Sequence, residues 1–216
     1  MRAALAAALC TALLALQPAH AQLPTLVSKG ASGLDYGNGY EPQRARKLDE
    51  LPPQVRLRVV THLQQRLGPL LYKDIRFLGG DMVDAKLVQA AQGDVPAYRL
   101  EFALRRPEVG IDLYVATIEL RADGSPMQEI DLPCYACHPE KLQMIDLAAA
   151  AAVAVANGMS ESRMQVGIDY DREADALVWV FTQRVTQGSA AVDDRLLVDA
   201  HSGDVVARLQ DPIPAQ

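Results

Sequence analysis

The feature that most constrains the fold of this chain is that its two halves repeat one order of elements. In each half, a segment with helical periodicity is followed by strand-like segments and by a glycine-containing turn, at Gly124 and Gly203. These glycines lie 203 − 124 = 79 residues apart, and the strands expected around Leu100 and Trp179 keep the same offset. Repetition of one supersecondary unit predicts an α+β protein of two units, each a helix packed on an antiparallel sheet.

Hydrophobic periodicity places the elements of the first unit. Apolar residues recur every four positions over 55–67, which predicts a helix that ends at Gly68-Pro69. Strict alternation over 98–104 predicts a half-buried strand, the apolar stretch 111–120 predicts a second, and a returning strand is expected through 128–132.

The second unit has the same order. We expect a helix over 142–157 and strands over 164–170, 176–181, 196–199 and 205–209. The first unit has additional residues at 79–96, for which an added strand or a long hairpin loop is expected.

The N-terminus has the features of a signal peptide. A positive charge at Arg2 precedes an apolar run, and Ala19 and Ala21 occupy positions −3 and −1 of a cleavage site before Gln22. The apolar run is shorter than the roughly 20 residues needed to span a bilayer. We therefore expect a mature protein that begins near Gln22 and is periplasmic or secreted.

The mature chain is expected to be acidic. Removal of Arg2 from the 21 basic residues leaves 20, against 27 acidic residues. Binding to nucleic acid or to an anionic membrane surface depends on Lys and Arg, and no later segment is long and apolar enough for a membrane span. The composition predicts no nucleic-acid binding and no membrane insertion, so the expected partner is another exported protein.

The segment Cys134-Tyr135-Ala136-Cys137-His138 lies between the two units. Two cysteines spaced by two residues and followed by histidine are the attachment pattern of c-type haem. In that chemistry each thiol adds to one vinyl group, and the histidine binds the iron as an axial ligand. Cys134, Cys137 and His138 are therefore the candidate cofactor-binding residues, and His138 is a metal ligand only if haem is present. Leu132, Tyr135, Leu142 and Met144 are the candidate pocket walls.

A Cys134–Cys137 disulfide is the alternative, because an exported chain meets an oxidising compartment. A bridge that closes so short a loop contributes only about 2 kcal/mol in the chain-entropy model. A redox-active thiol pair is disfavoured because Pro133 and Pro139 place the helix start after His138. The sequence leaves haem and disulfide open.

A second pattern resembles a metal site. Asp169, Asp171, Glu173 and Asp175 alternate as at the start of a calcium loop, but Ala174 stands where glycine is required. A solvated hairpin turn is therefore expected. No serine has histidine and aspartate partners in a recognisable order, so we expect no enzyme.

The second unit resembles the PepSY family of small exported domains. The matching features are the Ala-rich helix, the apolar strand 178–181, and the closing hairpin 197–206, in which Asp199, Ser202 and Gly203 match the family pattern. The resemblance covers about 142–210. The first unit departs from it, with Arg121 where the hairpin would have aspartate. The resemblance implies a cystatin-like, helix-on-sheet fold with a binding, inhibitory or accessory role and no active site.

These patterns divide the chain into a signal peptide (1–21), an extended N-terminal arm (22–50), the first unit (51–133), a Cys-x-x-Cys-His junction (134–141) and the PepSY-like unit (142–212). The leading interpretation is a non-catalytic periplasmic binding or accessory protein. One alternative is an electron-transfer protein with one covalent haem c. The other is an inhibitor of a secreted peptidase.

Overall fold

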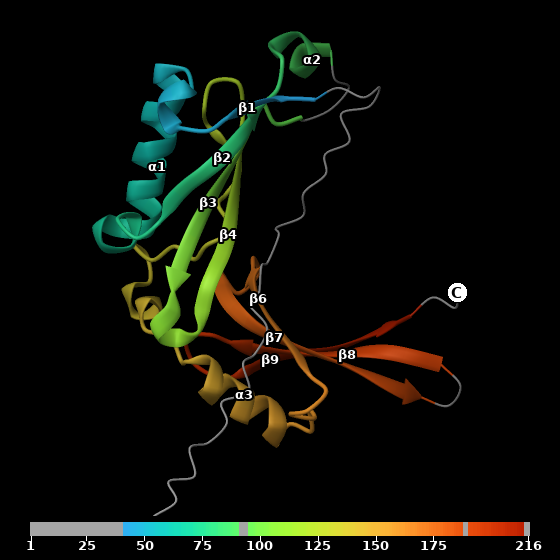
Figure 1. Cartoon of the computed structure of the whole chain (residues 1–216). Helices are drawn as coiled ribbons and strands as arrows, with labels where there is room; N and C mark the ends of the chain where they lie inside the picture. Colours follow the sequence, from blue (N-terminus) through green and yellow to red (C-terminus); the bar gives the residue numbers. More distant parts are fainter. Residues whose placement is uncertain (1–40, 91–94, 188–189, 214–216) are drawn as a thin grey trace, which may run out of the picture.

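The computed structural model describes residues 41–90, 95–187 and 190–213. Over these residues the chain forms two antiparallel sheets accompanied by few helices, which confirms the α+β class (Figure 1). The predicted signal peptide and residues 22–40 of the predicted arm lie outside the described residues.

The first sheet has the strand order β1-β2-β3-β4-β5, with every neighbouring pair antiparallel. The elements of this half are, in chain order, β1 (Gln43–Ala45), η1 (Leu48–Glu50), α1 (Pro53–Tyr72), β2 (Arg76–Met82), α2 (Ala85–Ala90), β3 (Tyr98–Arg106), η2 (Pro107–Val109), β4 (Ile111–Leu120) and β5 (Pro126–Gln128).

The second sheet has the order β6-β7-β8-β9 and is also antiparallel throughout. Its half contains η3 (Pro139–Leu142), α3 (Leu147–Ala156), β6 (Gln165–Asp171), β7 (Ala176–Gln187), β8 (Ala190–Asp199) and β9 (Val205–Pro212). The strands β7 to β9 are longer than the apolar segments that predicted them, because pairing continues through mixed polar and apolar residues, as between Arg184 and Asp193.

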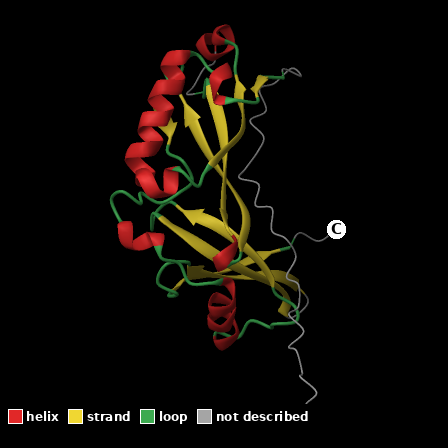
Figure 2. Cartoon of the chain, turned by 60° about the vertical axis from the view of Figure 1, so that its left-hand side comes forward, coloured by secondary structure: helices red, strands yellow, loops and turns green. Residues whose placement is uncertain are grey.

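Helix α1 has the predicted apolar stripe, which is buried at Val55, Val59, Leu63 and Leu67. These side chains belong to the same core as Leu100 and other buried residues of β3 and β4, and α1 lies alongside the first sheet (Figure 2). Gly68 interrupts the helix with φ 73°, a left-handed conformation that glycine adopts without strain. The break predicted at Gly68-Pro69 is confirmed, although one further helical stretch runs to Tyr72.

The helix predicted over 142–157 is wrong at its start. Residues 139–142 form the separate turn η3, and α3 begins only at Leu147. Asp146 sets this boundary, because its side chain accepts a hydrogen bond from the N–H of Ala149 at 2.7 Å and so caps the helix. Between the two helical pieces, the N–H of Ile145 donates to the carbonyl of Ala200 at 2.9 Å, which ties the chain to the second sheet.

Three further predictions need correction. The predicted arm is structured at its end, where β1 pairs with β2 and η1 follows. At 79–96, where an added strand or a long hairpin loop was expected, the last residues of strand β2 are followed by the helix α2, which was not expected. The returning strand predicted through 128–132 stops at Gln128, although Ile130 and Leu132 are still fully buried. Strand β5 is only three residues long and forms by pairing with β4. A strand this short has no hydrophobic periodicity from which its bounds could be predicted.

The core of the second half centres on Trp179, which is 1% exposed. It lies on the face of β7 that also buries Leu177 and Phe181, and α3 packs against β7 and β8. Buried residues of both halves form one continuous apolar cluster. The two sheets are therefore joined by hydrophobic contact as well as by the chain.

The buried carboxylate of Asp194 links β7, β8 and β9 in the half of the second sheet that lies beyond the Trp179 core. The Asp194 side chain is 3% exposed and accepts hydrogen bonds from Arg208 at 2.9 and 2.6 Å and from Gln183 at 3.2 Å. Gln183 in turn accepts from the N–H of Ser160 at 2.8 Å, and Arg208 donates to the carbonyl of Asn157. The hydrogen bonds from Arg208 lower the pKa of Asp194 despite its burial. This network fixes the C-terminal end of α3 on the sheet.

We expect Trp179→Ala to lower the free energy of unfolding by about 3–5 kcal/mol, because it leaves a large cavity in a closed core. Denaturant unfolding followed by circular dichroism measures this change. Leu57→Ala is the control, since Leu57 is 68% exposed and its truncation should change stability by no more than about 0.5 kcal/mol. Unchanged stability of the Trp179 variant would show that β7 is peripheral.

Candidate functional site

The Cys-x-x-Cys-His segment is a tight turn between β5 and η3. Cys134 and Cys137 form a disulfide with their Cα atoms 5.2 Å apart. The N–H groups of Cys137 and His138 both donate to the carbonyl of Cys134, at 3.0 and 2.9 Å. The 3-10 turn η3 begins at Pro139, so the prediction that helical structure starts after His138 is confirmed.

His138 faces outward from this turn. Its side chain is 51% exposed, and its Nδ1 lies 3.2 Å from Oε1 of Glu140. Of the four candidate pocket walls, Leu132 and Tyr135 are buried in the apolar core, and Leu142 and Met144 pack against that core. These residues fit a haem poorly in this arrangement, because Leu132 and Tyr135 are enclosed in the core and the two sulfur atoms are joined. Covalent haem stays the untested alternative to the disulfide.

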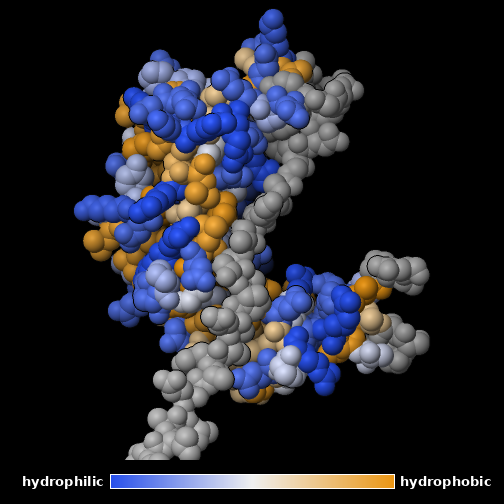
Figure 3. All heavy atoms as spheres, in the orientation of Figure 1, coloured by the Kyte–Doolittle hydropathy of each residue, from blue (hydrophilic) through white to orange (hydrophobic). Residues whose placement is uncertain are grey.

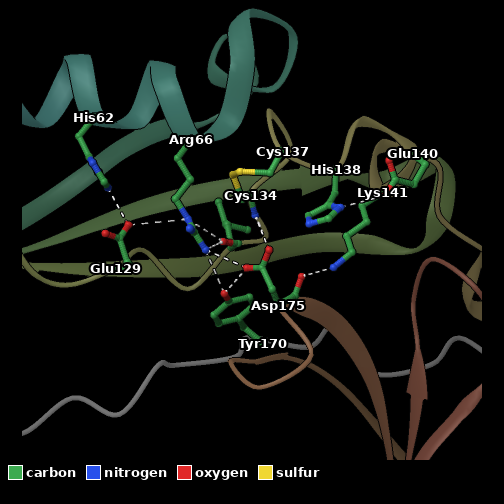
Figure 4. The surroundings of a disulfide bond; sticks show 11 residues. His62, Arg66, Glu129, Cys134, Cys137, His138, Glu140, Lys141, Tyr170 and Asp175 are labelled. Atoms are coloured by element: carbon green, nitrogen blue, oxygen red, sulfur yellow. Dashed lines mark hydrogen bonds and ion pairs between the residues drawn. A yellow bond between two sulfur atoms is a disulfide. The ribbon is translucent and has the colours of Figure 1, made fainter.

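Arg66 of α1 is the centre of the junction (Figure 4). Its side chain is 17% exposed, and Nη2 donates to the carbonyl of Leu132 at 2.9 Å, to the Tyr170 hydroxyl at 3.0 Å and to Oδ1 of Asp175 at 2.9 Å. Tyr170 and Asp175 belong to the second half of the chain. One side chain thus joins α1, the loop before the disulfide and the hairpin between β6 and β7.

Asp175 holds the other side of this group. Its Oδ1 accepts from the Tyr170 hydroxyl at 2.6 Å, and its Oδ2 accepts from the N–H of Cys134 at 3.0 Å. Burial alone would raise the pKa of Asp175, but these hydrogen bonds and the charges of Arg66 and Lys141 outweigh it and lower the pKa. Burial, followed by the hydrogen bond to Asp175, raises the pKa of Tyr170 to about 12.

The disulfide turn contacts both halves through its backbone. The N–H of Ala136 donates to the carbonyl of Arg66 at 2.9 Å, whereas the N–H of Cys134 binds Asp175. Lys141 adds a third contact, donating to the carbonyl of Asp175 at 2.7 Å. The turn is therefore hydrogen-bonded both to α1 and to the β6–β7 hairpin, and it holds the two together.

A hydrogen bond and an ion pair flank the centre. His62 of α1 lies 2.7 Å from Glu129, and Arg172 of the β6–β7 hairpin pairs with Asp131. Burial raises the pKa of Asp131, although Arg172 opposes this shift. Both carboxylates precede the disulfide, so the segment 129–131 is held from both sides.

His201, in the closing turn of the second unit, lies beside the disulfide turn. Its ring meets that of Tyr135 edge to face with centroids 6.1 Å apart, and its Nδ1 is 3.3 Å from the carbonyl of Gln143. Burial lowers the pKa of His201. This side chain packs the junction.

Asp175 is separated from the other three calcium-like carboxylates, Asp169, Asp171 and Glu173, which line one shallow cavity. Asp175 points into the junction, whereas Asp171 accepts hydrogen bonds from the N–H groups of Glu173 and Ala174, as a hairpin turn requires. Within the described ranges, no group of three or more His, Cys, Asp or Glu side chains is placed to hold a metal ion.

Sequence reasoning missed Arg66, Tyr170 and Asp175. Asp175 has φ 46°, a conformation that aspartate tolerates better than most residues. An aspartate at this position is therefore consistent with the predicted hairpin turn. It does not indicate that its side chain pairs with Arg66 of α1.

No protein-family model and no curated protein matches the sequence. Among solved structures, the chain is similar to one described as a "putative lipoprotein" from Clostridium difficile 630, at 15% identity and a TM-score of 0.27. The match covers 77% of this chain and 100% of that chain. At that TM-score it carries no argument. In the part of the chain that the structure describes, no helix is long and apolar enough to cross a membrane.

We expect protein produced in a haem-attaching host to be colourless, because the cysteines are engaged with each other and His138 with Glu140. Intact mass without added haem, no Soret band after denaturation, and two thiols alkylated only after reduction are the expected results. A haem mass that survives denaturation and is lost in the Cys134→Ala/Cys137→Ala variant would contradict the disulfide and establish covalent attachment.

Asp175→Asn is expected to lower the free energy of unfolding by about 1.5–3 kcal/mol at neutral pH, because it removes the charge that Arg66 and Tyr170 hold. Asparagine also tolerates the left-handed backbone, so the turn itself should be preserved. Urea unfolding of both proteins measures the difference, and Asp112→Asn, at an exposed position of β4, is the control.

The same pair of proteins has a defined pH dependence. Because the folded-state pKa of Asp175 is lowered, its stabilisation is complete above the unfolded-state value of 3.8 and is lost as the pH falls through the folded value. The difference in stability should stay constant between pH 7 and about pH 5 and shrink in more acidic solution. A difference that does not depend on pH would show that the carboxylate charge has no part in it.

Proposed function

We propose that this chain is an exported, non-catalytic binding or accessory protein of PepSY-like type. It holds a partner on the uncovered faces of its two sheets, meaning the faces on which no described helix packs. The observation that carries this proposal is the arrangement of the helices. Helix α1 lies on the outer side of the first sheet and α3 lies below the second (Figure 1). The surface is hollowed between the two halves, on the side away from α1 and above the second sheet (Figure 3).

Strand boundaries support an origin from two cystatin-like units. Strands β4 and β8 begin and end with the same offset of 79 residues (190 − 111 and 199 − 120). Strands β2 and β6 are offset by 165 − 76 = 89, and the 10 additional residues fall where the first unit contains α2.

The turns that close the two units are also alike. Gly124 and Gly203 have φ of 83° and 81°. A Cβ atom on Gly124 would lie 2.9 Å from Val55 near the start of α1, and one on Gly203 would lie 3.4 Å from Ile145 just before α3. In both units the closing turn therefore packs against the beginning of the helix, which supports one ancestral arrangement.

The hydrogen bonding at the junction supports a structural and binding role more than a catalytic or redox role. Arg66, Asp175 and Tyr170 satisfy one another, and the disulfide turn donates its N–H groups to the same centre. Groups arranged in this way fix a geometry and leave little capacity for a substrate. This favours the binding role over the alternative of electron transfer by haem.

The other alternative, inhibition of a secreted peptidase, is a special case of the binding role. Its test is the identity of the partner: an inhibitor would be recovered with a peptidase whose activity it reduces.

Site-specific photo-cross-linking in the producing cell tests the proposal. Thr182 and Val115 lie on the uncovered faces of β7 and β4, because they alternate with the buried residues Phe181 and Tyr114. A photoreactive residue at either position should give a discrete adduct. Leu57 and Val155, exposed on α1 and α3, are the matched controls. Adducts from the helical positions alone would place the partner on the opposite side and reject the proposal.

A further inference from the structure

The uncovered face of the second sheet contains a cavity of about 390 Å³. Its floor is apolar and consists of Val178, Val180 and Leu197. Val180 pairs with Leu197 on one side and with Gly167 on the other. Since Gly167 has no side chain, the row of side chains across β6, β7 and β8 is incomplete at this point. A Cβ on Gly167 would meet Val180 at 3.8 Å, an ordinary contact, so the space is available to an added side chain.

Charged side chains surround this floor, and their charges do not balance. Both arginines of the lining are neutralised from outside the cavity, Arg172 by Asp131 and Arg195 by Asp211 at 2.6 Å. The three acidic residues of the lining, Asp169, Asp171 and Glu173, make no ion pair with any described residue.

The negative charge of the lining affects the neighbouring carboxyl group of Asp131. Burial raises the pKa of Asp131, and the charge of Asp169 raises it further. Asp171 is held in place by the N–H groups of the hairpin turn, at 2.9 and 3.1 Å, so its carboxylate cannot turn away from the lining without breaking that turn.

We propose that this cavity receives a lysine or arginine side chain of the partner protein. The inference rests on the proposed binding function and names the chemistry of its contact. The aliphatic stem of such a side chain would cover Val178, Val180 and Leu197, and its cationic end would meet the carboxylates. An anionic group would be repelled, and an apolar group would desolvate the carboxylates without pairing them. The volume lies near the lower end of the roughly 300–1,000 Å³ of ligand pockets, which suits one side chain.

The test is a nuclear magnetic resonance titration of the mature protein with blocked pentapeptides. The probes are Ala-Ala-Lys-Ala-Ala and the same peptide with norleucine or glutamate at its centre. The lysine peptide should shift the amide signals of Asp169, Asp171 and Glu173 and the methyl signals of Val178 and Val180, and it should bind at least about fivefold more tightly than the norleucine peptide. The glutamate peptide should not bind.

Three variants probe the two parts of the cavity. Asp169→Asn and Glu173→Gln should each weaken the lysine peptide by roughly two- to fivefold and leave the norleucine peptide unchanged. Gly167→Leu should abolish binding of both, because it fills the floor while its backbone remains in an ordinary strand conformation. Glu161→Gln, exposed outside the lining, is the matched control and should change nothing.

Equal binding of the lysine and norleucine peptides, or an Asp169→Asn variant that binds as well as the parent, would overturn the inference. Butylamine that binds as tightly as the lysine peptide would also overturn it, because the site would then take a small amine and not a polypeptide. Cross-linking from Thr182 separates the two proposals. An adduct that persists in a variant with no peptide binding rejects the cavity and leaves the binding function, whereas peptide binding without any adduct rejects the function.

Discussion

The arrangement of the two sheets depends on one guanidinium group. Arg66 is largely withdrawn from solvent, and a cation in such a position must be hydrogen-bonded and paired. Its partners come from three segments: a carbonyl before the disulfide, the Tyr170 hydroxyl at the end of β6 and the Asp175 carboxylate in the next turn. A partly buried ion pair of this kind adds little net stability but is costly to break, so it selects one geometry.

Hydrophobic contact and the polar centre have different parts in that selection. The apolar cores of the two halves merge, and apolar surfaces attract in many relative orientations. The hydrogen bonds of Arg66 and Asp175 are directional and can form in only one relative orientation of the two halves. The disulfide contributes about 2 kcal/mol at most through its short loop. Its larger effect is to orient the N–H groups of Cys134 and Ala136 toward opposite halves.

The sequence predicted the elements whose own residues determine them. The stripe of α1, the alternation of β3 and β6 and the boundaries of β4 follow from periodicity, and Pro139 correctly placed the end of the disulfide turn. Strand β1 depends on pairing with β2, and the start of α3 depends on a single capping residue, Asp146. The contacts of Arg66 with Tyr170 and Asp175 span 104 and 109 residues, and no local pattern encodes such a distance.

If a partner binds both sheets, as proposed, the fixed angle between them would divide recognition between the two faces. On the uncovered face of the first sheet, Arg44 pairs with Asp81 at 3.0 Å and with Glu101 at 2.6 Å. The second sheet keeps its unpaired carboxylates beside an apolar floor. If the two faces share one partner, these carboxylates of the second sheet therefore supply the selection by charge. Because the junction holds both faces in place before binding, little ordering entropy is lost on association, and a contact as small as one basic side chain can decide which partner is held.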